Sequence, residues 1–99
     1  RWNPVETRLL ELEISTDWRE RAECRDYPTD LFFPAGETGP AEIQIKQAKE
    51  VCARCEVRDD CLLYALEANQ RDGIWGGLTS DERKRLRRRW LAERRRRTG

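Results

Sequence analysis

Histidine and methionine are absent from this 99-residue sequence, and hydrophobic residues make up only 37% of it. The absence of histidine excludes His-based catalytic triads and general bases, and zinc or Rieske-type iron sites that need imidazole ligands. No apolar run approaches the roughly 20 residues that a membrane-spanning helix requires. No signal-peptide pattern opens the chain, so we expect an intracellular protein.

The small apolar content limits the core that the chain can build. A single domain is expected at this length, and a domain this small has a marginal core. Small scaffolds often need covalent or metal cross-links in addition to packing. The four cysteines are the candidates for that role.

The net charge of +1 conceals an uneven distribution along the chain. Residues 1–82 carry ten basic and eighteen acidic side chains, whereas residues 83–99 carry ten basic side chains and one acidic. An acidic body with a basic tail predicts that the tail seeks polyanions. A charge run is more often a solvated tail than a specific reader of a ligand, but the density here favours contact with phosphates.

Hydrophobic periodicity and capping residues predict an all-α fold, a small bundle of four to five short helices. The expected helices are residues 3–14, capped by Asn3 with an apolar stripe of Val5, Leu9, Leu10 and Leu12; Asp17 to about Cys24; about Pro40 to Cys52; about Arg58 to Asn69; and a last helix from Thr79, with Glu82 completing a capping box. Residues 26–40 contain three prolines and two glycines and predict an extended loop. In the last helix, Leu86 and Trp90 form an apolar stripe that we expect to dock it on the body or on a partner.

The stretch Gly73-Ile74-Trp75-Gly76-Gly77 breaks this helical pattern with three glycines in five residues. Such density predicts a turn in which the backbone needs positive φ or comes close to another group. Taken alone, Trp75 is interpreted as a core residue that packs near the cysteines.

The cysteines follow the spacing C-x27-C-x2-C-x5-C, at Cys24, Cys52, Cys55 and Cys61. Three interpretations compete: two disulfides in a small secreted chain, a zinc site with four thiolates, or an iron–sulfur cluster. The spacing favours a metal or cluster site over disulfides, but it does not separate zinc from iron.

Four motifs together narrow the choice: "DLFFP", "AKEVCARCEVRDDCLLYAL", "GIWGG" and a following helix crowded with arginine and lysine. In this combination the chain resembles the WhiB-like (Wbl) family of actinobacterial transcription regulators. The resemblance runs from about Trp18 to Arg89, and residues 1–16 lie outside it. We expect three parts: an N-terminal extension over 1–16, a core over 17–78, and a basic helix over 79–99.

The resemblance implies a [4Fe–4S] cluster bound by Cys24, Cys52, Cys55 and Cys61. The fold would then be organised around the cluster. Because the helices share little apolar area, we expect the apo form to be largely disordered or loosely folded. We also expect disulfide bonds in the apo form.

The resemblance also implies a monomeric, cytoplasmic, nucleoid-associated regulator with no catalysis of its own and no membrane contact. It would be redox-sensitive and form a 1:1 complex with region 4 of the primary sigma factor in the RNA polymerase holoenzyme. The implied sigma-binding residues are Trp18, Phe32, Phe33, Gly73, Trp75, Gly76 and Gly77. The expected contacts with promoter DNA are Arg83, Lys84, Arg85, Arg87, Arg88, Arg89, Arg94, Arg95, Arg96 and Arg97.

A rival function is a thiol–disulfide oxidoreductase acting through Cys52-Ala53-Arg54-Cys55 in the apo form. A CxxC motif at a helix end lowers thiol pKa values and favours such chemistry. No thioredoxin-like βαβ pattern surrounds the motif, which counts against this alternative.

Overall fold

The computed structural model describes residues 4–12, 18–36 and 38–98. Four α-helices and three short 3₁₀ helices make up its regular structure: α1 (Pro4–Glu11), η1 (Trp18–Arg21), η2 (Glu23–Asp26), η3 (Thr29–Phe32), α2 (Pro40–Arg54), α3 (Arg58–Ala68) and α4 (Ser80–Thr98). Within the described ranges, the only extended pairing is an isolated bridge between Trp75 and Leu78. The predicted all-α fold is confirmed.

The helix ends follow the local sequence. Helix α2 has Pro40 in its first turn, where the missing N–H costs nothing. Helix α3 ends at Ala68, and the C-cap residue Asn69 adopts the left-handed conformation with φ of 53°. At the start of α4 the capping box is confirmed, because the Thr79 N–H donates to Glu82 Oε1 at 2.8 Å and the Glu82 N–H donates to Thr79 Oγ1 at 3.3 Å. The predicted caps Asn3 and Asp17 lie outside the described residues.

Two predictions for the N-terminal half were wrong in detail. The single helix expected up to Cys24 is two 3₁₀ turns, because Ala22 is extended with ψ of 130° between η1 and η2. The segment is too short to pay the entropic cost of nucleating an α-helix by itself, and short pieces favour the 3₁₀ form. The loop over 26–40 is not extended throughout, since η3 begins after Pro28, whose carbonyl accepts from the Leu31 N–H.

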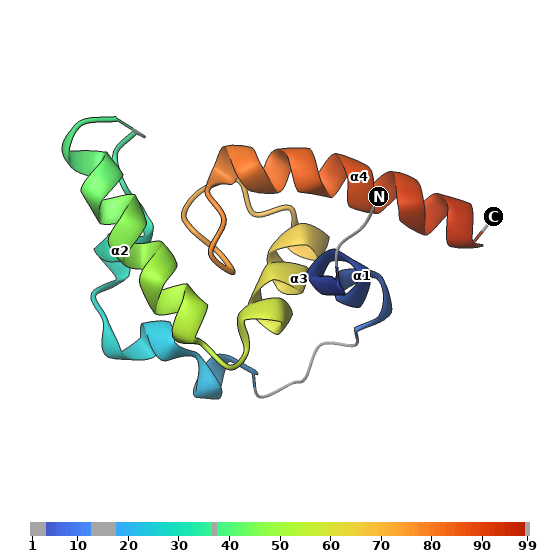
Figure 1. Ribbon diagram of the computed structural model, residues 1–99, viewed down its shortest axis with the longest axis horizontal. Helices are drawn as coiled ribbons and strands as arrows, with labels where there is room; N and C mark the ends of the chain where they lie inside the picture. The colour runs from blue at the N-terminus through green and yellow to red at the C-terminus, as the bar shows by residue number, and fades with distance from the viewer. Residues whose placement is uncertain (1–3, 13–17, 37, 99) are drawn as a thin grey trace.

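Helix α3 lies at the centre of the molecule (Figure 1). Helix α1 packs against α3 and α4 on one side, whereas α2 packs with η2 and η3 on the other. The turn between α3 and α4 projects toward α2. Helix α3 and this turn therefore lie between the side that contains α1 and the side that contains α2.

The largest core cluster joins both ends of the chain. It consists of Leu9, Leu62, Leu63, Leu66, Leu86 and Trp90. The Trp90 indole is only 1% exposed, and its N–H donates to the Leu9 carbonyl at 3.1 Å. The apolar stripe of α4 therefore docks on the body, and α1 is part of that body although it lies outside the resemblance.

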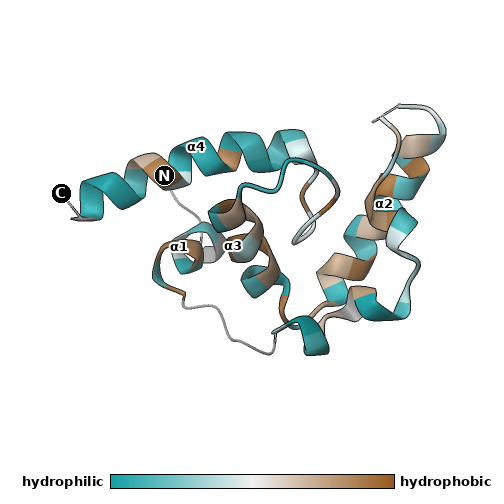
Figure 2. Ribbon diagram, turned by 180° about the vertical axis from the view of Figure 1, so that it is seen from behind, coloured by the Kyte–Doolittle hydropathy of each residue, from teal (hydrophilic) through white to brown (hydrophobic). Residues whose placement is uncertain are grey.

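Apart from this stripe, α4 is strongly hydrophilic along its length (Figure 2). No helix in the described part of the chain is both long and apolar enough to cross a membrane.

Two smaller clusters lie on the other side of α3. One contains Phe32, Ala48, Val51, Cys52 and Ile74. The other contains Trp18, Ala22 and Val57, with Tyr64 and Trp75 packed against it. In the described part of the chain, the apolar side chains are thus divided among three small clusters, as expected for a sequence with few of them.

Leu9→Ala tests whether α1 belongs to the folded body. Because Leu9 is 2% exposed in the largest cluster, we expect a loss of about 2–5 kcal/mol in the free energy of unfolding, measured by urea denaturation. Ile43→Ala is the control, since Ile43 is 66% exposed. Equal, small losses for both variants would show that α1 is only an appendage.

Candidate functional site

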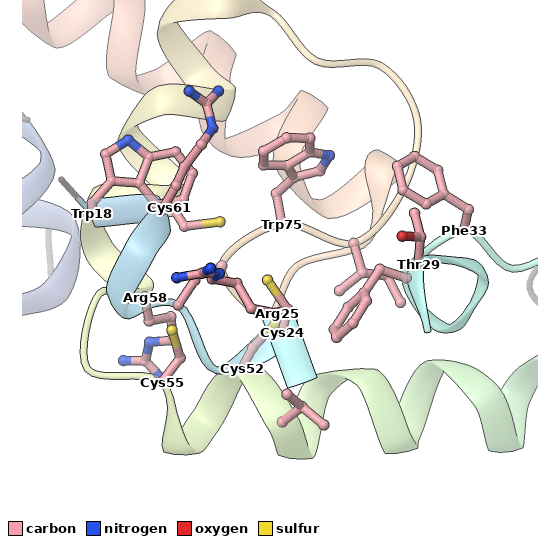
Figure 3. Close-up of a pocket in the computed structure, with 16 residues that line it drawn as sticks. Trp18, Cys24, Arg25, Thr29, Phe33, Cys52, Cys55, Arg58, Cys61 and Trp75 are labelled. Atoms are coloured by element: carbon pink, nitrogen blue, oxygen red, sulfur yellow. The ribbon is translucent and has the colours of Figure 1, made fainter. Parts of the chain in front are cut away.

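All four cysteines line one cavity of about 260 Å³. Cys24 comes from η2, Cys52 from the last turn of α2, Cys55 from the cap of that helix, and Cys61 from the first turn of α3. Figure 3 shows their sulfur atoms around the same space, with the Trp75 indole beside it. The tertiary fold therefore brings together every cysteine that the sequence singled out.

The thiols sit in surroundings with opposing effects on their charge. Burial raises the pKa of Cys61 to about 12, and neighbouring cysteines push it in the same direction. Burial also raises the pKa of Cys24 and of Cys52. Against this, the Gly76 N–H donates to Cys61 and the Gly77 N–H donates to Cys52, and both bonds favour the thiolate.

Four thiols are the donor set of a thiolate-bound metal centre, but in this structure they line a shared cavity and do not converge on one point. The four thiols are free, so the disulfides predicted for the apo form are not present in this structure. Among the residues that the structure describes, no three Cys, Asp or Glu side chains gather around one point that could hold a metal ion. The thiols instead line the cavity wall, where Arg25 and Arg58 also lie. Cationic side chains and backbone N–H donors offset the negative charge that four thiolates bring.

The CxxC alternative fares less well in these surroundings. Cys52 is buried, and that burial raises its pKa. A nucleophilic cysteine in a redox motif needs the opposite shift, since the thiolate is the reactive form. Metal ligation also uses the thiolate, so this shift does not separate the two functions. What counts against disulfide exchange is the absence of a thioredoxin-like sheet in the described residues, where the one extended pairing is the bridge between Trp75 and Leu78.

The glycine turn adopts the conformation that the sequence predicts. Gly73, Gly76 and Gly77 have φ values of 80°, 59° and 82°, a region that side-chain-bearing residues rarely enter. A Cβ on Gly76 would lie 2.5 Å from the Leu62 Cβ, and one on Gly73 would lie 2.6 Å from the Phe33 ring. Both reasons for glycine, positive φ and close approach, are confirmed.

The Arg83 side chain hydrogen-bonds to backbone carbonyls in and beside this turn. It is buried, at 2% exposure, and donates to four carbonyls. The acceptors are Gln70 O, Asp72 O, Gly73 O and Leu78 O, at 3.2, 3.0, 2.6 and 2.8 Å. The planar guanidinium suits this task because it offers five donors in a rigid fork.

This burial changes the expectation for Arg83 as a DNA contact. Its terminal nitrogens are used inside the protein, so we remove it from the DNA-contacting set. Sequence reasoning missed the role because Arg83 is one of many basic residues in its helix. The signal that was available is its spacing, three residues before Leu86 and seven before Trp90 on the buried stripe.

Five of the seven residues expected to bind sigma factor line the cavity, whereas Gly73 and Gly77 do not. Trp18, Phe32, Phe33, Trp75 and Gly76 all line it. Trp18 and Phe32 are buried, whereas Phe33 is 47% exposed. The Ile74 N–H donates to the Phe32 carbonyl at 2.7 Å, which ties the glycine turn to the "DLFFP" segment.

An aromatic residue that the sequence analysis missed links these side chains. Tyr64 lies between Trp18 and Trp75, with ring centroids 5.6 and 5.7 Å away. Arg19 covers the Tyr64 ring, 4.4 Å from its centroid. Tyr64 follows Cys61 by three residues, a helical spacing that places both on one face of α3.

The remaining basic residues of α4 differ in their surroundings. Lys84, Arg85 and Arg88 are exposed. Arg87 donates through Nε to the Leu66 carbonyl at 2.8 Å. Several others are held by acidic or aromatic groups: Arg89 by Glu6, Arg94 by Trp90, Arg96 by Glu93, and Arg97 by Glu93 and Glu11.

Comparison with known proteins adds a family to this geometry. A family model described as "Transcription factor WhiB" matches residues 18–86. The chain is 54% identical over 79 residues to transcriptional regulator WhiB1 of Bifidobacterium longum, covering 80% of this chain and 86% of that protein. It is 53% identical over 73 residues to WhiB1 of Mycobacterium tuberculosis (74% and 87% covered), and 49% identical over 72 residues to WhiD of Streptomyces coelicolor (71% and 64% covered).

Arg83→Ala should lower the free energy of unfolding by about 2–4 kcal/mol, because it leaves partly buried carbonyls in and beside the glycine turn without donors. Arg83→Lys should recover only part of the loss, since an ammonium cannot reproduce the fork. Lys84→Ala is the control and should change stability by less than about 0.5 kcal/mol. Urea denaturation measures all three, and equal losses for Arg83→Ala and Lys84→Ala would contradict the clamping role.

Proposed function

This chain belongs to the WhiB family of transcription factors, and on that premise we propose that it regulates transcription by binding region 4 of the primary sigma factor in RNA polymerase. The proposal includes a [4Fe–4S] cluster held by Cys24, Cys52, Cys55 and Cys61, and contact between α4 and promoter DNA. It describes a non-catalytic, monomeric regulator that forms a 1:1 complex with sigma factor and acts at the nucleoid in the cytoplasm.

The observation that carries the proposal is the meeting of the four thiols and the glycine turn at one cavity. The N–H groups of Gly76 and Gly77 donate to two of the four proposed ligands. A bound cluster supplies a redox-sensitive cross-link between η2, α2 and α3. Gly76 and Gly77 belong to the turn that carries Trp75. Their N–H groups therefore couple this turn to the proposed ligands.

The aromatic rim of the cavity supports sigma-factor binding. Phe33 is half exposed, and Trp75 is partly buried with its indole N–H donating to the Asp72 carbonyl at 3.0 Å. Large aromatic residues that are held in place and partly exposed are typical hot spots of protein interfaces. Such an interface would cover the cavity and exclude water from the centre.

DNA contact complements this interface in the proposal. Docking beside the −35 element brings α4 close to the upstream DNA. Each contact is weak by itself, but tethering one raises the effective concentration of the other. Phosphate contacts of this kind add affinity without reading sequence.

Co-expression with the sigma region 4 domain tests the proposal directly. We expect a 1:1 complex that is brown when purified anaerobically, with about four irons per chain and visible iron–sulfur absorption. Chelating the iron under reducing conditions should lower both the helical circular dichroism and the affinity for sigma factor, because the apolar clusters are small. Zinc in place of iron, or a metal-free chain that binds sigma factor equally well, would overturn the cluster assignment.

Trp75→Ala separates sigma binding from cluster binding. We expect the affinity for sigma region 4 to fall about 30-fold or more, as for a hot-spot residue, with the iron content unchanged. Ile43→Ala, on the exposed face of α2, should change neither quantity. If Trp75→Ala instead loses its iron, the tryptophan covers the metal centre and does not form the interface.

A further inference from the structure

A second cavity, of about 350 Å³, lies between the end of α3 and the first half of α4. It is lined by four basic side chains, Arg71, Lys84, Arg87 and Arg88, with Arg83 buried at its inner side. Among the described lining residues, Asp81 is the one carboxylate. We call this cavity the α3–α4 groove.

The α3–α4 groove is electropositive although it adjoins the C-terminal end of a helix. Carbonyls at such an end carry partial negative charge and would repel an anion. Here the Leu66 carbonyl accepts from Arg87 Nε at 2.8 Å, and the Gln70 carbonyl accepts from Arg83 Nη2 at 3.2 Å. The Leu66 carbonyl belongs to the last turn of α3 and the Gln70 carbonyl to the connection after it. Because arginines satisfy both carbonyls, neither is left to repel an anion in the groove. Because a guanidinium has five donors, Arg87 can hold Leu66 and still donate to a ligand.

The rim of the groove consists of exposed cations from two separate segments. Arg71 belongs to the connection after α3, whereas Lys84 and Arg88 lie one turn apart on α4. Cations converging from two directions can hold a phosphate more firmly than charges spaced along one helix.

The other end of α4 has acidic competitors. Arg89 donates to both carboxylate oxygens of Glu6 at 3.0 and 3.2 Å. Arg97 lies 3.3 Å from a Glu93 oxygen and 3.8 Å from a Glu11 oxygen. Exposed pairs of this kind are individually weak, but a phosphate must displace the carboxylate before it gains the arginine. The carboxylates of α1 therefore compete with a polyanion for some of the arginines of α4.

We propose that DNA backbone phosphates bind in the α3–α4 groove through Arg71, Lys84 and Arg88, and that the arginines near the C-terminal end of α4 contribute less. The inference rests on the proposed DNA contact and gives it a location. It adds Arg71, which lies outside the basic tail, to the residues that contact DNA. It also assigns a smaller contribution to Arg94–Arg97.

The test compares two triple variants of the full chain, purified anaerobically, that remove equal charge. One is Arg71→Ala, Lys84→Ala and Arg88→Ala in the groove; the other is Arg94→Ala, Arg96→Ala and Arg97→Ala, whose side chains have partners within the protein. Binding to a fluorescein-labelled 20-base-pair duplex is followed by anisotropy over a series of NaCl concentrations. Circular dichroism melting checks that each variant is folded.

The groove variant should reduce the slope of log K against log salt by about 2–3, and weaken binding at 0.1 M salt at least about tenfold. The control triple should reduce the slope by less than about 1. As a gain-of-function arm, Asp81→Asn should tighten binding, whereas Glu42→Gln on α2 should not.

Equal losses in the two triples, or a larger loss in the control, would overturn the groove assignment while leaving DNA contact intact. A wild-type chain that shows no salt-dependent binding to the duplex, and adds none to the sigma region 4 domain bound there, would overturn the DNA contact itself, together with the groove. Binding that neither triple affects would place the contact elsewhere on the protein.

Discussion

The guanidinium of Arg83 is the interaction on which the functional region depends. It donates to four carbonyls on both sides of the glycine turn and thereby fixes a backbone that runs through left-handed conformations. The same turn presents N–H groups to Cys52 and Cys61 and carries Trp75 to the rim of the cavity. One buried cation in α4 thus connects the basic helix, the aromatic rim and the thiols.

The distribution of apolar side chains explains why a cross-link would matter here. The largest cluster joins α1, α3 and α4 without any cysteine, whereas the cysteine cavity lies where two smaller clusters meet. The apolar side chains around the cavity are split between these two clusters, so no single apolar core joins η2, α2 and α3 there. A centre bound by Cys24, Cys52 and Cys61 would join η2, α2 and α3 at that place.

The arginines of α4 make different contacts, and the position of each on the helix decides which contacts it makes. Arg83 is part of the core, Arg87 holds the end of α3, and Arg89 pairs with a carboxylate from α1. Lys84 and Arg88 face solvent beside a groove. The acidic N-terminal helix and the basic C-terminal helix, distant in the chain, therefore meet and partly neutralise each other.

The sequence by itself determined the four α-helices, the capping box, the glycine conformations and the four cysteines, because these depend on local periodicity, caps and backbone sterics. Only the tertiary structure decided that Arg83 is buried, that Tyr64 bridges two tryptophans and that Leu9 packs on Trp90. Those contacts join residues far apart in the chain. The sequence alone does not distinguish one basic or aromatic residue from another, because their roles depend on which neighbours the fold gives them.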